Sequence, residues 1–205
     1  MGKSERNKQY ACQVLPQGYD IYKRIDLTRD RDALKAMVIW SITAALALIL
    51  PMLFVHPVKY AFDMPAVKIA ICIAASALGL IVYMFLHEWT HSVCIRAFTG
   101  TSASVGLELK RGIAYASSRW YFKKTPYMII ALAPVIIWGM LLALLMSDID
   151  EKYFWYLYVI QIFNVTGASG DIYVVCAALR MPKKILVLDS GMAMEFYAET
   201  VLCCR

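Results

Sequence analysis

The sequence predicts an all-α membrane protein with four transmembrane helices and a small β-hairpin between the second and the third. Of its 205 residues, 60% are hydrophobic and only 18% are charged, which is far from the composition of an average soluble domain. The apolar residues gather in runs long enough to cross a bilayer, for which a helix needs about 20 residues. Basic residues flank these runs. Composition, run length and flanking charge together favour a polytopic membrane protein.

Four segments have the length and apolarity of transmembrane helices. They cover about residues 33–55, 66–100, 125–146 and 154–179, and we expect the third to be interrupted at Ala133-Pro134. As one straight helix the second segment would measure roughly 50 Å, more than the hydrocarbon thickness of about 30 Å. Residues near its end should therefore lie close to a membrane interface.

The segments outside these runs are polar or mixed in character. Small and β-branched residues alternate over residues 101–118, which favours a β-hairpin with Arg111-Gly112 as its turn. The N-terminal segment lacks the apolar core of a cleaved secretion signal, and we expect at most a short ordered patch at Tyr19 to Ile25. The predicted organisation is a cytoplasmic N-terminal arm, a transmembrane domain and a cytoplasmic tail, at residues 1–32, 33–180 and 181–205.

Lysine and arginine residues are distributed unevenly over the connections. Eight lie at Lys35 or before it, six lie from Arg96 to Lys124 and four lie from Arg180 onward, whereas the other two connections and their flanks hold three. The positive-inside rule therefore predicts that both termini are cytoplasmic, and we expect the cell membrane as the location. The net charge of +6 is assigned to topology and lipid headgroups, so membrane lipids are expected partners and nucleic acid is not. The six cysteines show no paired spacing and predict no disulfide framework.

One motif near the end of the second span carries the chemistry. His87 and His91 are four residues apart, so on a helix they share one face and could bind one zinc ion. Glu88 would then lie beside the metal and could take a proton from a bound water. A histidine on an apolar helix is more often a structural residue, but this spacing should arise by chance in only about one such chain in a thousand. A zinc site that uses two of the three histidines is therefore the stronger interpretation.

A catalytic zinc usually has three protein ligands, and Asp171 is the best candidate for the third. Asp171 is the only acid inside the fourth span, where an ionisable group is by default functional, and its distance from Arg180 places it at a depth similar to that of the histidines. Cys94 shares the helical face of the pair but lies about 7 Å further along the axis, out of reach. Asn164 lies on nearly the same face as Asp171. Its side chain could bind a substrate, orient a ligand or make an ordinary interhelical contact. The glycines at 167 and 170 should loosen the helix between them.

These motifs together resemble the site-2 proteases and, more closely, the zincin peptidase family related to them. The resemblance covers about residues 66–180 and includes His87-Glu88-x-x-His91, the hairpin segment and the Asn164…Gly170-Asp171 span. It implies a membrane-embedded zinc endopeptidase in which His87, His91 and Asp171 hold Zn²⁺ and Glu88 is the general base for a zinc-activated water. It also implies a polypeptide substrate, membrane-associated, bound to the hairpin by strand addition. Site-2 proteases carry an Asn-x-x-Pro…Asp-Gly pattern, whereas this chain has Gly167 at the proline position and Ile172 after the aspartate.

The alternative is a zinc-binding membrane module without catalysis, such as a chaperone or a regulator. Glu88 argues against it, because a purely structural site has no need of an acid at that position, and a structural zinc tends to fill its fourth position with protein. The sequence specifies neither the substrate nor an oligomeric state.

Overall fold

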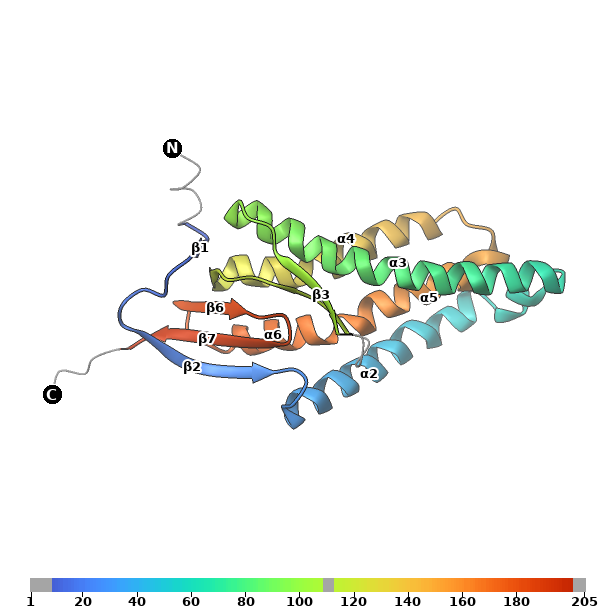
Figure 1. Ribbon diagram of the computed structural model, residues 1–205. Coiled ribbons are helices and arrows are strands. Elements are labelled where there is room, and N and C mark those ends of the chain that lie inside the picture. The colour runs from blue at the N-terminus through green and yellow to red at the C-terminus, as the bar shows by residue number, and fades with distance from the viewer. Residues whose placement is uncertain (1–8, 109–112, 201–205) are drawn as a thin grey trace. The chain divides into compact units, whose positions relative to one another are not determined.

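The computed structural model describes residues 9–108 and 113–200 (Figure 1). Its helices are α2 (Arg31–Val55), the short 3-10 helix η1 (Val58–Phe62), α3 (Ala66–Thr99), α4 (Lys124–Met146), α5 (Glu151–Gly167) and α6 (Ser169–Leu179). Its strands are β1 (Ala11–Cys12), β2 (Tyr19–Asp26), β3 (Ser104–Glu108), β4 (Ile113–Ser117), β5 (Tyr121–Lys123), β6 (Ile185–Asp189) and β7 (Ala193–Glu199).

The chain divides into two compact units that share the long helices. The sheet unit comprises Met1–Lys35, Glu88–Ala133 and Asp171–Arg205, so it holds every strand together with one end of α2, α3 and α4 and most of α6. The helical unit comprises Ala36–His87 and Pro134–Gly170. Helices α2, α3 and α4 each have residues in both units.

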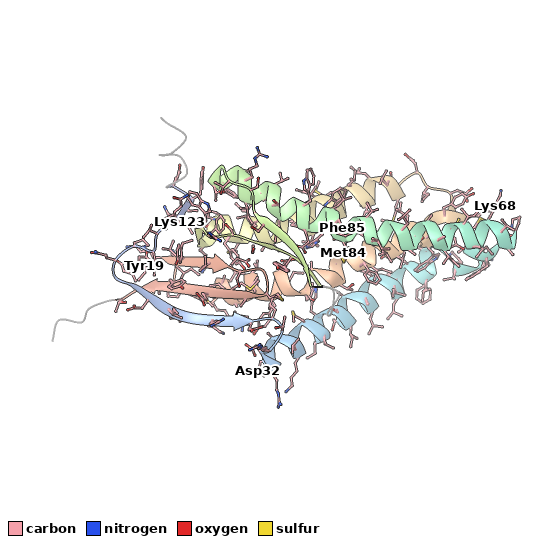
Figure 2. The ribbon with its side chains drawn as sticks, in the orientation of Figure 1. Tyr19, Asp32, Lys68, Met84, Phe85 and Lys123 are labelled. Carbon is pink, nitrogen blue, oxygen red and sulfur yellow. The ribbon has the colours of Figure 1, made fainter. Side chains whose placement is uncertain are left out.

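Four helical segments are long and apolar enough to cross a membrane, as the sequence predicts. They are Arg31–Val55, Ala66–Thr99, Lys124–Met146 and Glu151–Leu179. Many large apolar side chains on them are exposed, including Phe54, Val67 and Leu144 at 87%, 71% and 69%. Such a surface suits lipid, since soluble proteins rarely expose contiguous apolar patches of this extent. Figure 2 shows the side chains along α3, from Lys68 near its beginning to Met84 and Phe85 beyond its middle.

Two details of the spans concern helix breaks. Helix α4 runs through Pro134, so the predicted interruption at Ala133-Pro134 is wrong as a break in the helix. Proline has no N–H, however, and the carbonyl four residues earlier, that of Ile130, therefore lacks its usual helical donor. In the fourth span the predicted loosening is confirmed, because α5 ends at Gly167 and α6 begins at Ser169.

In the helical unit, hydrogen bonds from side chains to backbone tie α5 to its three neighbours. The Trp40 Nε1–H and the Ser41 hydroxyl of α2 donate to the α5 carbonyls of Val165 and Thr166, over 3.3 and 3.0 Å. The Ser76 hydroxyl of α3 donates to the carbonyl of Tyr156, and the Asn164 amide donates to the carbonyl of Val135 in α4. Polar contacts of this kind commonly hold transmembrane helices together, because lipid offers no competing hydrogen bonds.

The sheet unit corrects the predicted fold class, because it contains a five-stranded sheet that the sequence did not indicate. The strand order is β1-β5-β6-β7-β2, and every neighbouring pair is antiparallel. Figure 1 shows β6, β7 and β2 side by side. Segments expected to be a polar arm and a tail thus become β1, β2, β6 and β7, and the ordered patch at Tyr19 to Ile25 is part of β2. The predicted hairpin is confirmed as the pair β3–β4, with Val105 opposite Ala116. Its predicted turn, Arg111-Gly112, lies outside the described residues.

The core of the sheet unit lies between the sheet and the helix ends. Phe122, Val187 and Phe196 contribute strand side chains that are at most 1% exposed. They form one cluster with buried residues of the helices, namely Ile95 of α3, Tyr127 and Ile130 of α4, and Val174 and Ala178 of α6. This packing fixes the ends of α3, α4 and α6 that carry the candidate site.

Candidate metal centre

Helix α3 presents the histidine motif on its buried face. One ligand atom from each of His87, Glu88 and His91 lies within 4.8 Å of the other two. His87 and His91 are 9% and 8% exposed, whereas Trp89 between them is 59% exposed. This separation follows from the helical repeat, because residues four apart share a face and Trp89 is rotated away from both.

In the sheet unit, His91 is held by a backbone carbonyl and faces a carboxylate. Its Nδ1 lies 2.9 Å from the carbonyl oxygen of Ile130. A carbonyl can only accept, so Nδ1 carries a hydrogen, which leaves Nε2 as the nitrogen that a metal ion could bind. This carbonyl is the one that Pro134 leaves without a helical donor, and His91 takes the place of the missing N–H. His91 Nε2 lies 3.5 Å from Asp171 Oδ1, so the structure brings the predicted third ligand to the second histidine.

In the helical unit, a short relay of hydrogen bonds orients His87. The Asn164 amide nitrogen donates to the carbonyl of Val135 over 3.1 Å, which fixes Asn164 Oδ1 as an acceptor. The Tyr83 hydroxyl donates to that oxygen over 2.6 Å. Its only hydrogen is then committed, so the contact of 3.0 Å between Tyr83 and His87 Nδ1 requires the ring to donate. Nε2 of His87 is therefore also the nitrogen that a metal ion could bind.

This donor set fits a zinc ion. Zinc commonly binds two imidazole nitrogens and a carboxylate, and the second nitrogen of each imidazole usually donates to a carbonyl, hydroxyl or carboxylate. Both histidines show that arrangement, with Ile130 and Tyr83 as the outer partners. Cys94 packs against the hydrophobic core of the sheet unit, in line with its exclusion as a ligand.

The sequence prediction did not include Tyr83, although the signal was present. Tyr83, His87 and His91 are spaced by four residues and so share one face of α3. Substrate binding, ligand orientation and plain interhelical contact are the three roles predicted for Asn164, and the structure shows it fully buried with both amide atoms hydrogen-bonded inside the unit, one of them to α4. Its described contacts are those of a residue that orients His87 through Tyr83.

A second carboxylate, Asp189, also escaped the sequence prediction. It ends β6, and its Oδ1 accepts a hydrogen bond of 2.7 Å from the N–H of Gly191, which has φ +92° in the following turn. Burial of the carboxyl group raises its pKa to about 6, and the charge of Asp171 adds to the rise. Hydrogen bonds from Gly191 and Tyr127 and the charge of His91 act to lower the pKa. The sequence signal was an apolar run followed by Asp-Ser-Gly, which is typical of a strand that ends in a turn.

Comparisons with known proteins agree with this geometry. The family model described as "Putative zincin peptidase" matches residues 80–186, which include the histidine motif and Asp171. A curated relative, described as an uncharacterised 24.7 kDa protein in the gap 5′ region of Pyrococcus woesei, is 33% identical over 127 residues. That match covers 60% of this chain and 54% of the relative, so the chain spans about half the length of the curated relative. No solved structure matches the chain.

The family match spans more than half of the chain, and its description indicates a metallopeptidase for which zinc is the implied metal. The His-Glu-His group on α3 supplies suitable ligand atoms. On both grounds, the chain belongs to the zincin peptidase family.

Proposed function

We propose that this protein is a membrane-embedded zinc endopeptidase of the site-2 protease type, which hydrolyses peptide bonds of membrane-associated polypeptides. The observation that carries the proposal is the hydrogen-bonding pattern of the motif. Ile130 and Tyr83 hold the Nδ1 atoms of His91 and His87, which leaves Nε2 of each ring as the nitrogen for a metal ion. Asp171 Oδ1 lies 3.5 Å from one of these nitrogens.

Each residue has a distinct role in the proposed mechanism. His87, His91 and Asp171 would hold zinc, which when bound supplies a Lewis acid and lowers the pKa of a coordinated water to about 7. Glu88 accepts a proton from the attacking water and returns it to the leaving amine. Asn164 keeps the Tyr83 hydroxyl in place and thereby keeps the ring of His87 oriented. The apolar surroundings limit the access of bulk water.

The hairpin β3–β4 is the proposed site of substrate docking. It is a two-stranded sheet in which Ser104 to Glu108 pair with Ile113 to Ser117. Among the described strands, neither of the two pairs with the five-stranded sheet, so the hairpin has outer edges with backbone groups that an extended peptide could pair with. Strand addition would also hold the substrate unwound, which hydrolysis of its backbone requires.

We also propose that both termini lie in the cytoplasm and that the protein resides in the cell membrane. The distribution of lysine and arginine supports this orientation, and four helices that could span the membrane return the chain to the side on which it began. The sheet unit and the motif end of α3 would then lie on the cytoplasmic side.

A Glu88→Gln variant tests catalysis against the alternative of a zinc module without activity. We expect it to retain zinc by elemental analysis and to lose cleavage of a membrane-tethered reporter peptide by at least 100-fold, since general acid–base catalysis contributes about 10²–10⁴-fold. The matched control is Glu151→Gln at the start of α5, which should cleave as the parent does. Equal cleavage by Glu88→Gln and the parent would refute the assigned base, and absence of cleavage by a zinc-loaded parent on a panel of such reporters would favour the non-catalytic module.

A further inference from the structure

A cavity in the sheet unit lies at the beginning of α4, away from the histidine motif in the sequence. Its volume is about 340 Å³, within the roughly 300–1,000 Å³ typical of ligand sites. It is lined by residues of the segment before β1, the end of α3, the β5–α4 junction and the segment before β6, namely Gln9, Tyr10, Phe98, Lys123, Lys124, Thr125, Pro126, Ile129 and Lys183. Figure 2 marks Lys123, the last residue of β5.

The charge of this cavity is entirely positive. Three lysines line it, and none of its lining residues is acidic. The Lys124 amine is held by the carbonyls of Leu179 and Met181, which carry no net charge, so its positive charge remains uncompensated. Among the described residues, no ion pair involves Lys123 or Lys183. The first turn of α4 also contains no acid, and its helix dipole adds to the positive potential.

The cavity is polar at the start of α4 and apolar further along the helix. Lys124 and Thr125 begin the helix, and Ile129 follows about 7 Å further along the axis, 50% exposed. Phe98 of α3 faces the same cavity, and its ring centroid lies 5.2 Å from that of Tyr10. Helix α4 is one of the candidate membrane spans, so the polar end of the cavity corresponds to the headgroup level and the apolar end to the acyl chains.

We propose that this cavity binds the headgroup of an anionic phospholipid, with Lys123 and Lys183 on the phosphate and an acyl chain beside Ile129. The charge selects an anion, and the apolar continuation distinguishes a lipid from a soluble phosphate. Basic pockets beside transmembrane helices on the cytoplasmic side are known to take such headgroups. The proposal requires membrane insertion but does not depend on peptidase activity.

Native mass spectrometry of the full-length protein in detergent tests this proposal, with phosphatidylglycerol and phosphatidylcholine as probes. We expect the parent to retain one phosphatidylglycerol at a concentration at which phosphatidylcholine is lost. The Lys123→Gln/Lys183→Gln variant should bind phosphatidylglycerol about 25-fold more weakly, since each nearby lysine contributes about fivefold. The matched control is Lys23→Gln/Lys35→Gln, which removes the same charge from exposed positions of the sheet unit that do not line the cavity. The control should bind as the parent does.

A second variant tests the proposal even if the double lysine variant fails to fold. Thr125→Glu places a carboxylate at an exposed position of the cavity wall without removing a lysine, and it should also weaken phosphatidylglycerol binding. Inorganic phosphate in large excess should not displace the lipid. Equal weakening in the cavity and control variants, no preference of the parent for phosphatidylglycerol, unchanged binding by Thr125→Glu, or displacement by inorganic phosphate would each overturn the proposal.

Discussion

Removal of the Tyr83 hydroxyl should weaken zinc binding from outside the ligand set. In Tyr83→Phe the His87 Nδ1–H loses its acceptor at 3.0 Å, and the ring loses the contact that fixes its tautomer and orientation. Loss of such an outer partner typically costs 10–100-fold in metal affinity, or about 1.4–2.7 kcal/mol. Asn164 Oδ1, in a residue that is 0% exposed, also loses its donor, which should lower the free energy of unfolding by about 1–3 kcal/mol.

The assay must separate the effect on zinc from the effect on stability. Zinc affinity is measured by competition with a chromophoric chelator, and stability by thermal unfolding in detergent, on the same preparation. Tyr156→Phe is the matched control, because the Tyr156 hydroxyl also donates to a carbonyl inside the helical unit, that of Ala61 at 2.8 Å. We expect both variants to lose stability and only Tyr83→Phe to lose zinc affinity. Zinc affinities within twofold of the parent in both variants would refute the relay.

Three further predictions concern Asp171, Pro134 and Asp189. Asp171→Asn should reduce the zinc content of the purified protein at least tenfold, whereas Asp148→Asn in the exposed α4–α5 connection should not; equal zinc contents would remove Asp171 from the ligand set. Pro134→Ala restores a backbone donor to the carbonyl of Ile130 and should weaken zinc binding about tenfold without loss of helix content, as judged by chelator competition and circular dichroism; unchanged affinity would count against this role of the proline. The folded-state pKa of Asp189 is about 6, above an unfolded value of about 4, so the native state binds protons more tightly than the unfolded state. Protonation of Asp189 therefore stabilises the parent at low pH, and the parent should lose this stabilisation as pH rises from about 4 to 6. In zinc-free samples the melting temperature of Asp189→Asn minus that of the parent should therefore increase over this range and level off above it; a flat difference would contradict the assigned pKa.

The spans were predictable because their signal is local. An apolar run of the right length specifies a transmembrane helix whatever its neighbours are, and the bounds of α3 agree with the expected 66–100 within one residue. The break in the fourth span was also predictable, since two glycines near Ala168 weaken a helix locally. At Pro134 the same reasoning failed, because α4 continues and the vacated acceptor at Ile130 is used by a side chain from another helix.

The five-stranded sheet was not predictable, because its strands are short and their partners are distant in sequence. Strand β1 has two residues and β5 has three, too few for a pattern of alternation. Strand β2 is polar, with five consecutive exposed residues, since only its Ile25 end reaches the core. Its pairing with β7 joins Tyr19 to Glu199, a relation that no local window contains.

The candidate site was predictable in part, because some of its residues form a local pattern and others meet only in the fold. The histidine motif is a local pattern on one helix, and the depth argument named Asp171, which the structure brings to His91. The assignment of these residues as zinc ligands stays a prediction. For Tyr83 and Asp189 the sequence offers only a helical spacing and a turn signal, because their roles depend on contacts with Asn164 and Tyr127, which come from other parts of the chain.

The pairing of β2 with β7 sets an order of events during biosynthesis. Strand β2 precedes all four candidate spans and β7 follows them, so seven residue pairs between the two strands must wait until the last span has left the ribosome. Contacts between such distant segments form late, because a long loop must close first. Asp189 ends the strand beside β7 and is delivered in the same late step. The surroundings of the motif are therefore completed only after translation has passed the membrane region, and a nascent chain would carry its histidines without their finished environment.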